Sequence, residues 1–161
     1  MQIIKIAQVN DALSQMVALF RVELRSYKGI ASKPNIEAGR QELEEYLAAG
    51  FPVFAALVDG QYTGYVVCRV DSEVVWVESI FVREEYRRQG VASALHGKAE
   101  EIAASYGEDT VYNYVHPNNH RMIKFLRKRG YTVLNLIEIR KPHKGEKLTQ
   151  VIQVGEHQYD Y

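Results

Sequence analysis

Apolar and polar residues alternate at the start of the chain and then change to a helical spacing. The alternation over residues 2–8 predicts a strand. Asn10 or Asp11 is placed to cap a helix, because the apolar residues after them recur every three or four positions. The same spacing over residues 35–49 predicts a second helix that ends before a glycine. Each helix therefore has one apolar face for packing against a core.

After residue 50 the apolar period falls to two, and short polar turns divide the alternating stretches. This pattern is typical of an antiparallel meander, with strands at 51–58, 62–70 and 74–82. Helical spacing returns over residues 88–106. The rest of the chain predicts a strand at 110–116, a helix at 118–129, and strands at 131–140 and 148–154. The expected order is β-α-α-β-β-β-α-β-α-β-β, a mixed α/β (α+β) fold with one sheet.

Length and composition narrow the class of protein. The chain has 161 residues, of which 47% are hydrophobic and 25% charged, so we expect one globular domain over residues 1–161. Its single cysteine, Cys68, cannot form an internal disulfide, which suits a reducing compartment. No apolar run reaches the roughly 20 residues that span a bilayer, and the N-terminus lacks a signal-peptide pattern. We therefore expect a cytoplasmic protein with no membrane partner.

Charge is unevenly distributed although the total is zero. The chain carries 20 Lys plus Arg and 20 Asp plus Glu, so no overall attraction to nucleic acid is expected. Residues 121–147 hold nine basic and two acidic side chains, a local balance of +7 against −7 elsewhere. A solvated helix face explains such a run as well as a binding surface does. Nucleic-acid binding through it is the weakest of the functions considered.

The segment with the most chemical information joins an apolar strand to a helix. After residues 74–82 come a short charged turn and the sequence Arg87-Arg88-Gln89-Gly90-Val91-Ala92. Gly90 and Ala92 are small enough for a ligand to approach the backbone. The first turn of a helix offers unpaired N–H groups and the positive end of its dipole, which together favour a phosphate or diphosphate. We interpret the segment as a diphosphate site.

These residues resemble the acetyl-CoA signature of the GNAT superfamily of N-acetyltransferases, Arg/Gln-x-x-Gly-x-Gly/Ala. A second family motif places apolar residues and a Gly-aromatic pair at fixed distances after an Asn. It is matched by Asn119, Met122, Ile123, Phe125 and Gly130-Tyr131. The predicted element order also agrees with the family's fold over nearly the whole chain. The resemblance implies a single N-acetyltransferase domain that uses acetyl-CoA as its cosubstrate.

The resemblance also assigns coenzyme residues. The backbone of Ile80, Phe81 and Val82 would pair with the pantetheine arm like an added strand, and the N–H of Ile80 or Phe81 would serve the oxyanion. Asn119 would hydrogen-bond the coenzyme near the pantetheine, and the basic helix 121–129 would attract its 3′-phosphate. The pyrophosphate would be held by the amides of Arg88, Gln89, Gly90, Val91, Ala92 and Ser93, and Arg87 would also belong to the coenzyme site.

Acetyl transfer to an amine also needs a base, and Glu78 is our leading candidate. A carboxylate inside an apolar strand is costly unless it lies near water, is paired or is functional. Strand alternation places it on one face with Trp76, Ile80 and Val82, unless a bulge shifts the parity. A structural pairing of Glu78 with an Arg or a Tyr is an equally good interpretation. In some relatives the base lies five residues before the Asn, a position held here by Tyr114.

One position departs from the family's pattern. Many relatives place a Tyr seven residues after the Asn to protonate the departing thiolate, and Leu126 stands there in this chain. Either solvent or another side chain supplies the proton, or the chain is a non-catalytic acyl-CoA-binding or protein-interaction module. The nearest candidates for the acid are Tyr112, Tyr114, His116 and His120. The two histidines have no evident third partner for a metal, so we expect no metal.

The sequence thus predicts an acetyl-CoA-dependent N-acyltransferase that acetylates a primary amine of a small molecule or a protein. In the family, the acceptor site is shaped by segments that correspond to residues 27–35 and 141–147. The negative balance outside the basic stretch suits a cationic acceptor such as a protein N-terminus, a lysine, a polyamine or an aminoglycoside. The sequence leaves open which of these it is and whether the chain forms a homodimer.

Overall fold

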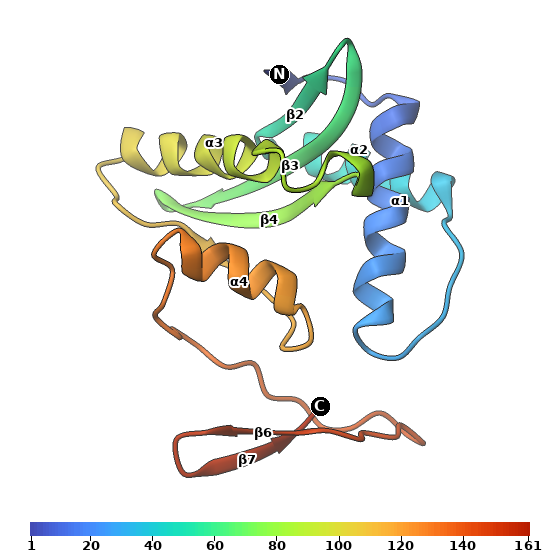
Figure 1. Ribbon diagram of the computed structural model, residues 1–161, viewed down its shortest axis with the longest axis vertical. Coiled ribbons are helices and arrows are strands. Elements are labelled where there is room, and N and C mark those ends of the chain that lie inside the picture. The colour runs from blue at the N-terminus through green and yellow to red at the C-terminus, as the bar shows by residue number, and fades with distance from the viewer. The chain divides into compact units, whose positions relative to one another are not determined.

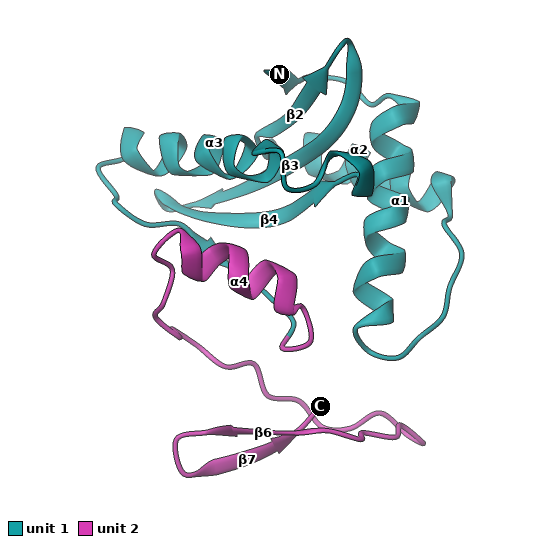
Figure 2. Cartoon of the chain, in the orientation of Figure 1, with its two compact units in different colours: residues 1–116 teal, residues 117–161 magenta.

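The computed structural model describes residues 1–161, which form two compact units, residues 1–116 and residues 117–161 (Figure 2). Figure 1 labels their helices and strands. The first unit contains β1 (Gln2–Ile6), α1 (Asp11–Ser26), α2 (Ile36–Ala48), β2 (Val53–Val58), β3 (Gln61–Asp71), β4 (Val74–Val82), the short 3₁₀ helix η1 (Glu84–Tyr86), α3 (Val91–Ser105) and β5 (Tyr112–Asn113). The second unit contains α4 (His120–Lys128), β6 (Val151–Val154) and β7 (His157–Asp160).

Helices α1 and α2 begin where the sequence places their caps. The side chain of Asn10 accepts a hydrogen bond from the backbone N–H of Leu13 at 2.9 Å, and Asn35 accepts one from Ala38 at 3.0 Å. Each asparagine satisfies an N–H of the first turn that has no partner inside its helix. The two predicted helices are confirmed. None of the helices is both long and apolar enough to cross a membrane.

The first unit is built on a five-stranded sheet in the order β1-β2-β3-β4-β5. Strands β1 to β4 pair antiparallel with their sheet neighbours, as the alternating pattern predicts for the meander. β5 is parallel to β4. β5 is much shorter than the predicted strand 110–116, because only Tyr112 and Asn113 of that stretch pair with β4.

Helices cover both faces of this sheet (Figure 1). α3 packs on one face, where the side chains of Leu95 and Val82 lie beside the backbone of Gly64. α1 and α2 pack on the other face through a buried apolar cluster formed by Ile6, Leu13, Met16, Val17, Leu43, Val53, Ala55, Tyr65, Val67 and Phe81. Removing these side chains from water is the main contribution to the stability of the unit. The side chains of β4 are thereby divided between two different surroundings.

The second unit shows where the sequence predictions are wrong. Residues 131–140 form no strand, whereas β6 lies within the predicted strand 148–154 and β7 is a strand that was not predicted. An alternating apolar pattern becomes a strand only where a neighbouring strand shares its backbone hydrogen bonds, and no strand pairs with residues 131–140. β6 and β7 pair only with each other. The prediction of one sheet is therefore wrong, since the structure has two.

Helices α1 and α2 cross closely at Gly39. A Cβ atom on this residue would collide with the carbonyl oxygen of Ser14 and would lie 2.9 Å from the backbone N of Ala18. Both are backbone atoms of α1, so they could move aside only if the helix itself shifted. The missing side chain at Gly39 therefore sets how closely α2 approaches α1.

Replacing Gly39 by Ala should destabilise the protein, although Ala favours helices. Overpacking of this kind lowers the free energy of unfolding by about 1–3 kcal/mol. Gly97→Ala is the matched control, because Gly97 also lies inside a helix but a Cβ there meets no atom within 4 Å. We expect the control to raise the free energy of unfolding by about 0.5–1 kcal/mol. Urea unfolding measures both variants, and an equal response would contradict the close crossing.

Candidate functional site

Strand β4 has a free backbone edge along its last residues. β5 pairs with β4 at two positions near its other end, whereas β3 pairs with it as far as Val82. The backbone N–H of Arg83 donates to the carbonyl oxygen of Thr63 in β3 at 2.9 Å. Because backbone groups alternate in direction along a strand, those of Val82 and Ile80 point to the opposite side. They face the side on which β5 no longer pairs.

The short strand β5 is held by a side chain of α3. His96 is fully buried, and its Nε2 lies 3.2 Å from Oδ1 of Asn113 in β5. Asn113 also donates through Nδ2 to the carbonyl oxygen of Val111 at 3.2 Å, and Nδ1 of His96 lies 3.3 Å from Glu100. These side-chain contacts fix β5 on α3 although its backbone pairing with β4 is short. The adjoining edge of β4 is left open.

The predicted diphosphate segment folds into a turn followed by a helix. α3 starts at Val91, three residues later than predicted, and Gly90 is its N-cap with a φ of 84°, in the region that favours glycine. The first hydrogen bond within the helix runs from Ala94 to the carbonyl oxygen of Gly90 at 3.0 Å. The amides before it have no partner within α3 and belong to Val91, Ala92 and Ser93. A Cβ on Gly90 would meet no atom within 4 Å, so a ligand can approach this backbone.

Arg87, the first residue of the motif, lies against the free edge of β4. Its Nε donates to the carbonyl oxygen of Val82 at 2.9 Å, and its Nη2 lies 3.3 Å from Oε2 of Glu23 on α1. The guanidinium carbon lies 5.6 Å from the centre of the Phe81 ring. Arg87 therefore joins the strand to the helix, a contact that the sequence did not predict.

Glu78 is the extra residue of a bulge in β4. Val67 of β3 lies opposite Ser79, and the next residue, Cys68, lies opposite Val77. The register therefore shifts by one residue at Glu78. A one-residue bulge shifts by one position which side chains point to each face of the sheet. The side chains after Glu78 consequently lie on the opposite faces to those that simple alternation predicts.

The bulge changes which residues share a face with Glu78. Oε2 of Glu78 lies 3.2 Å from Nε of Arg69, whose guanidinium carbon is 4.4 Å from the centre of the Trp76 ring. Trp76 and Glu78 therefore lie on one face, as predicted. The placement of Ile80 and Val82 with them is wrong, because Val82 packs toward α3 on the other face. Glu78 is exposed and ion-paired rather than buried among apolar side chains.

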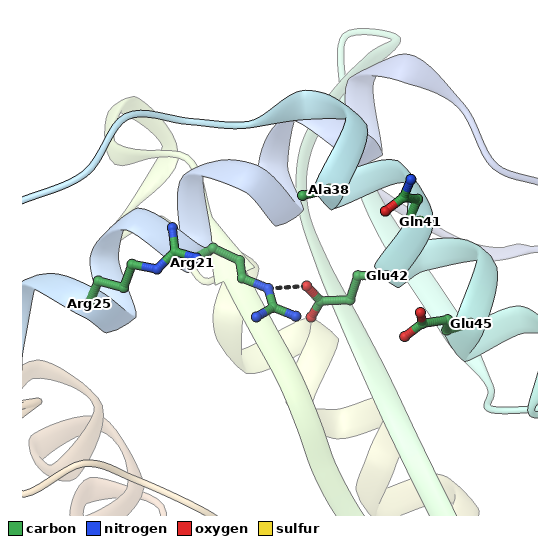
Figure 3. A pocket seen from close by; sticks show the side chains of 6 residues that line it. All are labelled: Arg21, Arg25, Ala38, Gln41, Glu42 and Glu45. Carbon is green, nitrogen blue, oxygen red and sulfur yellow. Dashed lines mark hydrogen bonds and ion pairs between the residues drawn. The ribbon is translucent and has the colours of Figure 1, made fainter. Parts of the chain in front are cut away.

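A buried carboxylate that the sequence reasoning missed is Glu42 on α2. Glu42 is 9% exposed and accepts hydrogen bonds from Arg21 on α1 and from the hydroxyl of Tyr46. Figure 3 shows Arg21 and Glu42 meeting between the two helices. A pocket of about 210 Å³ there is lined by Arg21, Arg25, Ala38, Gln41, Glu42 and Glu45. The signal was available, because Glu42 falls on the apolar face of its helix beside Leu43.

Two tyrosines on the α1 and α2 side of the sheet are held in the neutral form. Tyr65 is fully buried, and its hydroxyl shares a hydrogen bond with that of Ser79 at 2.9 Å. Burial raises the pKa of Tyr65 and of Tyr46, and the hydrogen bond to Glu42 raises that of Tyr46 further. Ser79 directly precedes Ile80. Both tyrosine hydroxyls therefore stay protonated, and that of Tyr65 lies beside the residue that precedes Ile80.

The predicted proton donors lie in different surroundings. Tyr112 is half-buried on β5, and Tyr114 is 66% exposed. The ring of His116 stacks on that of Tyr27 with 6.1 Å between centres and 15° between planes, and burial lowers the pKa of His116. A lower pKa disfavours the protonated imidazole that a proton donor needs, which weakens the case for His116 as the acid. His120 begins α4 in the second unit.

Asn119 caps helix α4 in the second unit. Its Oδ1 accepts a hydrogen bond from the backbone N–H of Met122 at 3.1 Å. Leu126, at the position of the family's tyrosine, is a buried residue of the same helix. The second unit carries nine basic and four acidic side chains, and the first carries eleven basic and sixteen acidic ones. The charge separation seen in the sequence therefore follows the division into units.

The sequence and the fold both resemble acetyltransferases. The profile of the acetyltransferase (GNAT) family matches residues 16–131. An N-alpha-acetyltransferase of Sulfurisphaera tokodaii is 29% identical over a match that covers 60% of this chain and 64% of that protein, just under two thirds of its length. A ribosomal-protein-alanine N-acetyltransferase of Brucella melitensis biovar Abortus superposes with a TM-score of 0.65 at 16% identity, covering 88% of this chain and 99% of that chain. For an aminoglycoside antibiotic 6′-N-acetyltransferase of Acinetobacter haemolyticus the TM-score is 0.63 at 20% identity, covering 89% and 99%. With the GNAT fold and a family match over most of its length, this chain belongs to the GNAT family of acetyltransferases.

Proposed function

We propose that the protein is an acetyl-CoA-dependent N-acetyltransferase that transfers the acetyl group directly to a primary amine. The observation that carries the proposal is the free edge of β4, which leads through residues 83–90, including η1, to the first-turn amides of α3. A free strand edge suits the amide groups of a pantetheine arm, and a helix N-terminus suits a diphosphate. Membership of the family supports the same activity.

The proposed coenzyme position follows from the directions of the backbone groups. The pantetheine arm would run along Ile80 and Val82, while Phe81 between them turns its backbone toward β3. The carbonyl oxygen of Val82 accepts a hydrogen bond from Arg87, so the arm would use the N–H of Val82 and the carbonyl oxygen of Ile80, which leaves the N–H of Ile80 for the oxyanion. The pyrophosphate would accept hydrogen bonds from amides of residues 88–93. Asn119 remains a predicted ligand of the coenzyme.

In the proposed reaction the neutral amine attacks the thioester carbonyl, a C–N bond forms, and the C–S bond breaks to release the thiolate of CoA. Glu78 would accept the proton of the amine, directly or through water, because it is exposed on the strand that carries the coenzyme edge. The N–H of Ile80 would stabilise the oxyanion. Tyr114 is the alternative base. Since Leu126 cannot donate a proton, the thiolate would take one from a tyrosine near β5 or from solvent.

A protein N-terminal amine is the acceptor that we propose first. The Sulfurisphaera relative is named an N-alpha-acetyltransferase, and the Brucella structure is that of a ribosomal-protein-alanine N-acetyltransferase. The acidic first unit also favours the approach of a cationic amine. A cationic small molecule such as an aminoglycoside is the second candidate, because the Acinetobacter structure is that of an aminoglycoside acetyltransferase.

The family match crosses the boundary between the two units, which supports a single N-acetyltransferase domain over residues 1–161. No group of three or more His, Cys, Asp or Glu side chains is arranged to hold a metal ion. A reaction without a metal, a cytoplasmic location, the lack of nucleic-acid binding and a homodimer stay predictions from the sequence.

Gly90→Glu should greatly weaken the binding of acetyl-CoA. The new carboxylate would stand at the N-terminus of α3, where it would repel the pyrophosphate and compete for the same amides. Gly90→Ala is the matched control, since it brings the same backbone strain of about 1–2 kcal/mol without a charge. Titration calorimetry should show a loss of roughly a hundred-fold for Glu, or about 2.7 kcal/mol, and a much smaller loss for Ala. Equal affinities in two folded variants would contradict the diphosphate site.

Glu78→Gln should lower kcat by about 10²–10⁴-fold without changing the affinity for acetyl-CoA, because it removes the proposed base and leaves the backbone edge intact. Glu73→Gln, in the turn between β3 and β4, is the control carboxylate. Release of the CoA thiol over a panel of amines, including peptide N-termini, measures the rate. A full rate in Glu78→Gln together with a slow Tyr114→Phe variant would move the base to Tyr114. Tight coenzyme binding without thiol release from any amine would favour the non-catalytic module.

A further inference from the structure

The last turns of α1 lie beside the end of β4, and the two enclose a groove of about 400 Å³. Glu23 on α1, Phe81 on β4 and Arg87 after η1 are among the residues that line it. The groove adjoins the free edge to which the coenzyme is assigned, yet sequence reasoning found no site residue on α1. The contacts of Glu23 give this helix a role in the site.

Glu23 uses both of its carboxylate oxygens. Oε2 lies 3.3 Å from Nη2 of Arg87, and Oε1 accepts a hydrogen bond from the hydroxyl of Tyr27 at 3.2 Å. Arg87 in turn donates to the carbonyl oxygen of Val82, and Tyr27 stacks on His116. One carboxylate on α1 therefore connects the end of β4 with the segment that follows β5. β4 and β5 are the two strands whose pairing stops at Val77, beyond which the edge of β4 is free.

We propose that Glu23 is a positioning residue of the coenzyme site, which holds Arg87 on the carbonyl oxygen of Val82. Because that carbonyl oxygen already accepts a hydrogen bond from Arg87, a pantetheine arm would pair with β4 no further than Val82. The same contact would fix the position of the segment 88–93 that follows. The proposal rests on the proposed function, because it concerns how the same edge receives acetyl-CoA. It gives Arg87 a different role from that of the predicted coenzyme-binding residue.

The surroundings of Arg87 favour positioning over direct binding of a phosphate. The side chains of Arg87 and Glu23 are 22% and 21% exposed, so their ion pair is better shielded than one on the open surface. Two donors of the guanidinium are already directed at Val82 and Glu23. Without Glu23, Arg87 would keep its charge beside the ring of Phe81 but lose its counter-charge. The Arg87 side chain would then turn toward solvent, and the carbonyl oxygen of Val82 would lose its hydrogen bond.

The test compares two ligands that share the pantetheine arm. Acetyl-CoA carries the diphosphate, whereas S-acetylpantetheine does not. If Glu23 and Arg87 shape the strand edge, Glu23→Gln and Arg87→Met should each weaken both ligands by about ten-fold, as expected for one charge-assisted hydrogen bond. The double variant should lose no more than either single variant, because the two residues act as a unit. Titrations followed through the amide signals of Ile80 and Val82 measure both affinities in the full chain.

Glu85→Gln is the matched control, because Glu85 lines the same groove without an ion pair to Arg87. It should leave both affinities unchanged. Tyr27→Phe removes the second contact of Glu23 and keeps the first, and it should weaken the ligands less than Glu23→Gln does. Thermal unfolding shows whether each variant is folded.

The outcomes separate this inference from the proposed function. A loss confined to acetyl-CoA would show that Arg87 acts on the diphosphate, and unchanged affinities in Glu23→Gln would remove Glu23 from the site. Either result overturns the inference and leaves the coenzyme site standing. If the unaltered protein binds neither ligand, the proposed function fails together with the inference. Equal, non-additive losses for both ligands would establish Glu23 as the positioning residue.

Discussion

The feature on which the site depends is the free backbone edge at the end of β4. Backbone N–H and C=O groups require partners, and an unpaired edge is normally covered or blocked in a folded protein. Here β5 pairs only with Trp76 and Val77 of β4, and α3 begins at Val91, soon after β4 ends at Val82. The strand edge and the helix N-terminus therefore present unpaired backbone groups along one stretch of the chain. In the proposed site, a linear ligand with amides at one end and a diphosphate at the other would meet both sets of groups. The chemistry proposed for the protein follows from that ligand.

Ion pairs inside the first unit arrange the side chains around this edge. Arg87 is held by Glu23, Glu78 by Arg69, and Glu42 by Arg21. In each case the two partners come from different segments of the chain, so the ion pair holds these segments together as well as neutralising a charge. These pairs are partly buried, so removing one partner would leave an uncompensated charge that destabilises the fold. The charged residues of the site are therefore part of its framework.

The alternation of apolar residues was a good guide to the meander, and the asparagines at positions 10 and 35 marked the starts of two helices. Such signals are local, since a cap or a run of alternating residues acts over a few positions. The segment 131–140 alternates well enough to predict a strand, but it forms none, because a strand also needs a neighbour. For the same reason β5 is shorter than its pattern. Pairing partners lie far apart in the chain and leave little trace in local spacing.

The sequence by itself determined the turn that starts α3, because Gly90 allows the left-handed backbone at this position and leaves the space beside it unfilled. It also determined the family. Only the tertiary structure decided which face carries Glu78, since a bulge against β3 changes the parity of the strand. Only the tertiary structure joined Glu23 to Arg87, which are 64 residues apart. Register and long-range contacts arise when the core packs as a whole, so no local pattern can specify them.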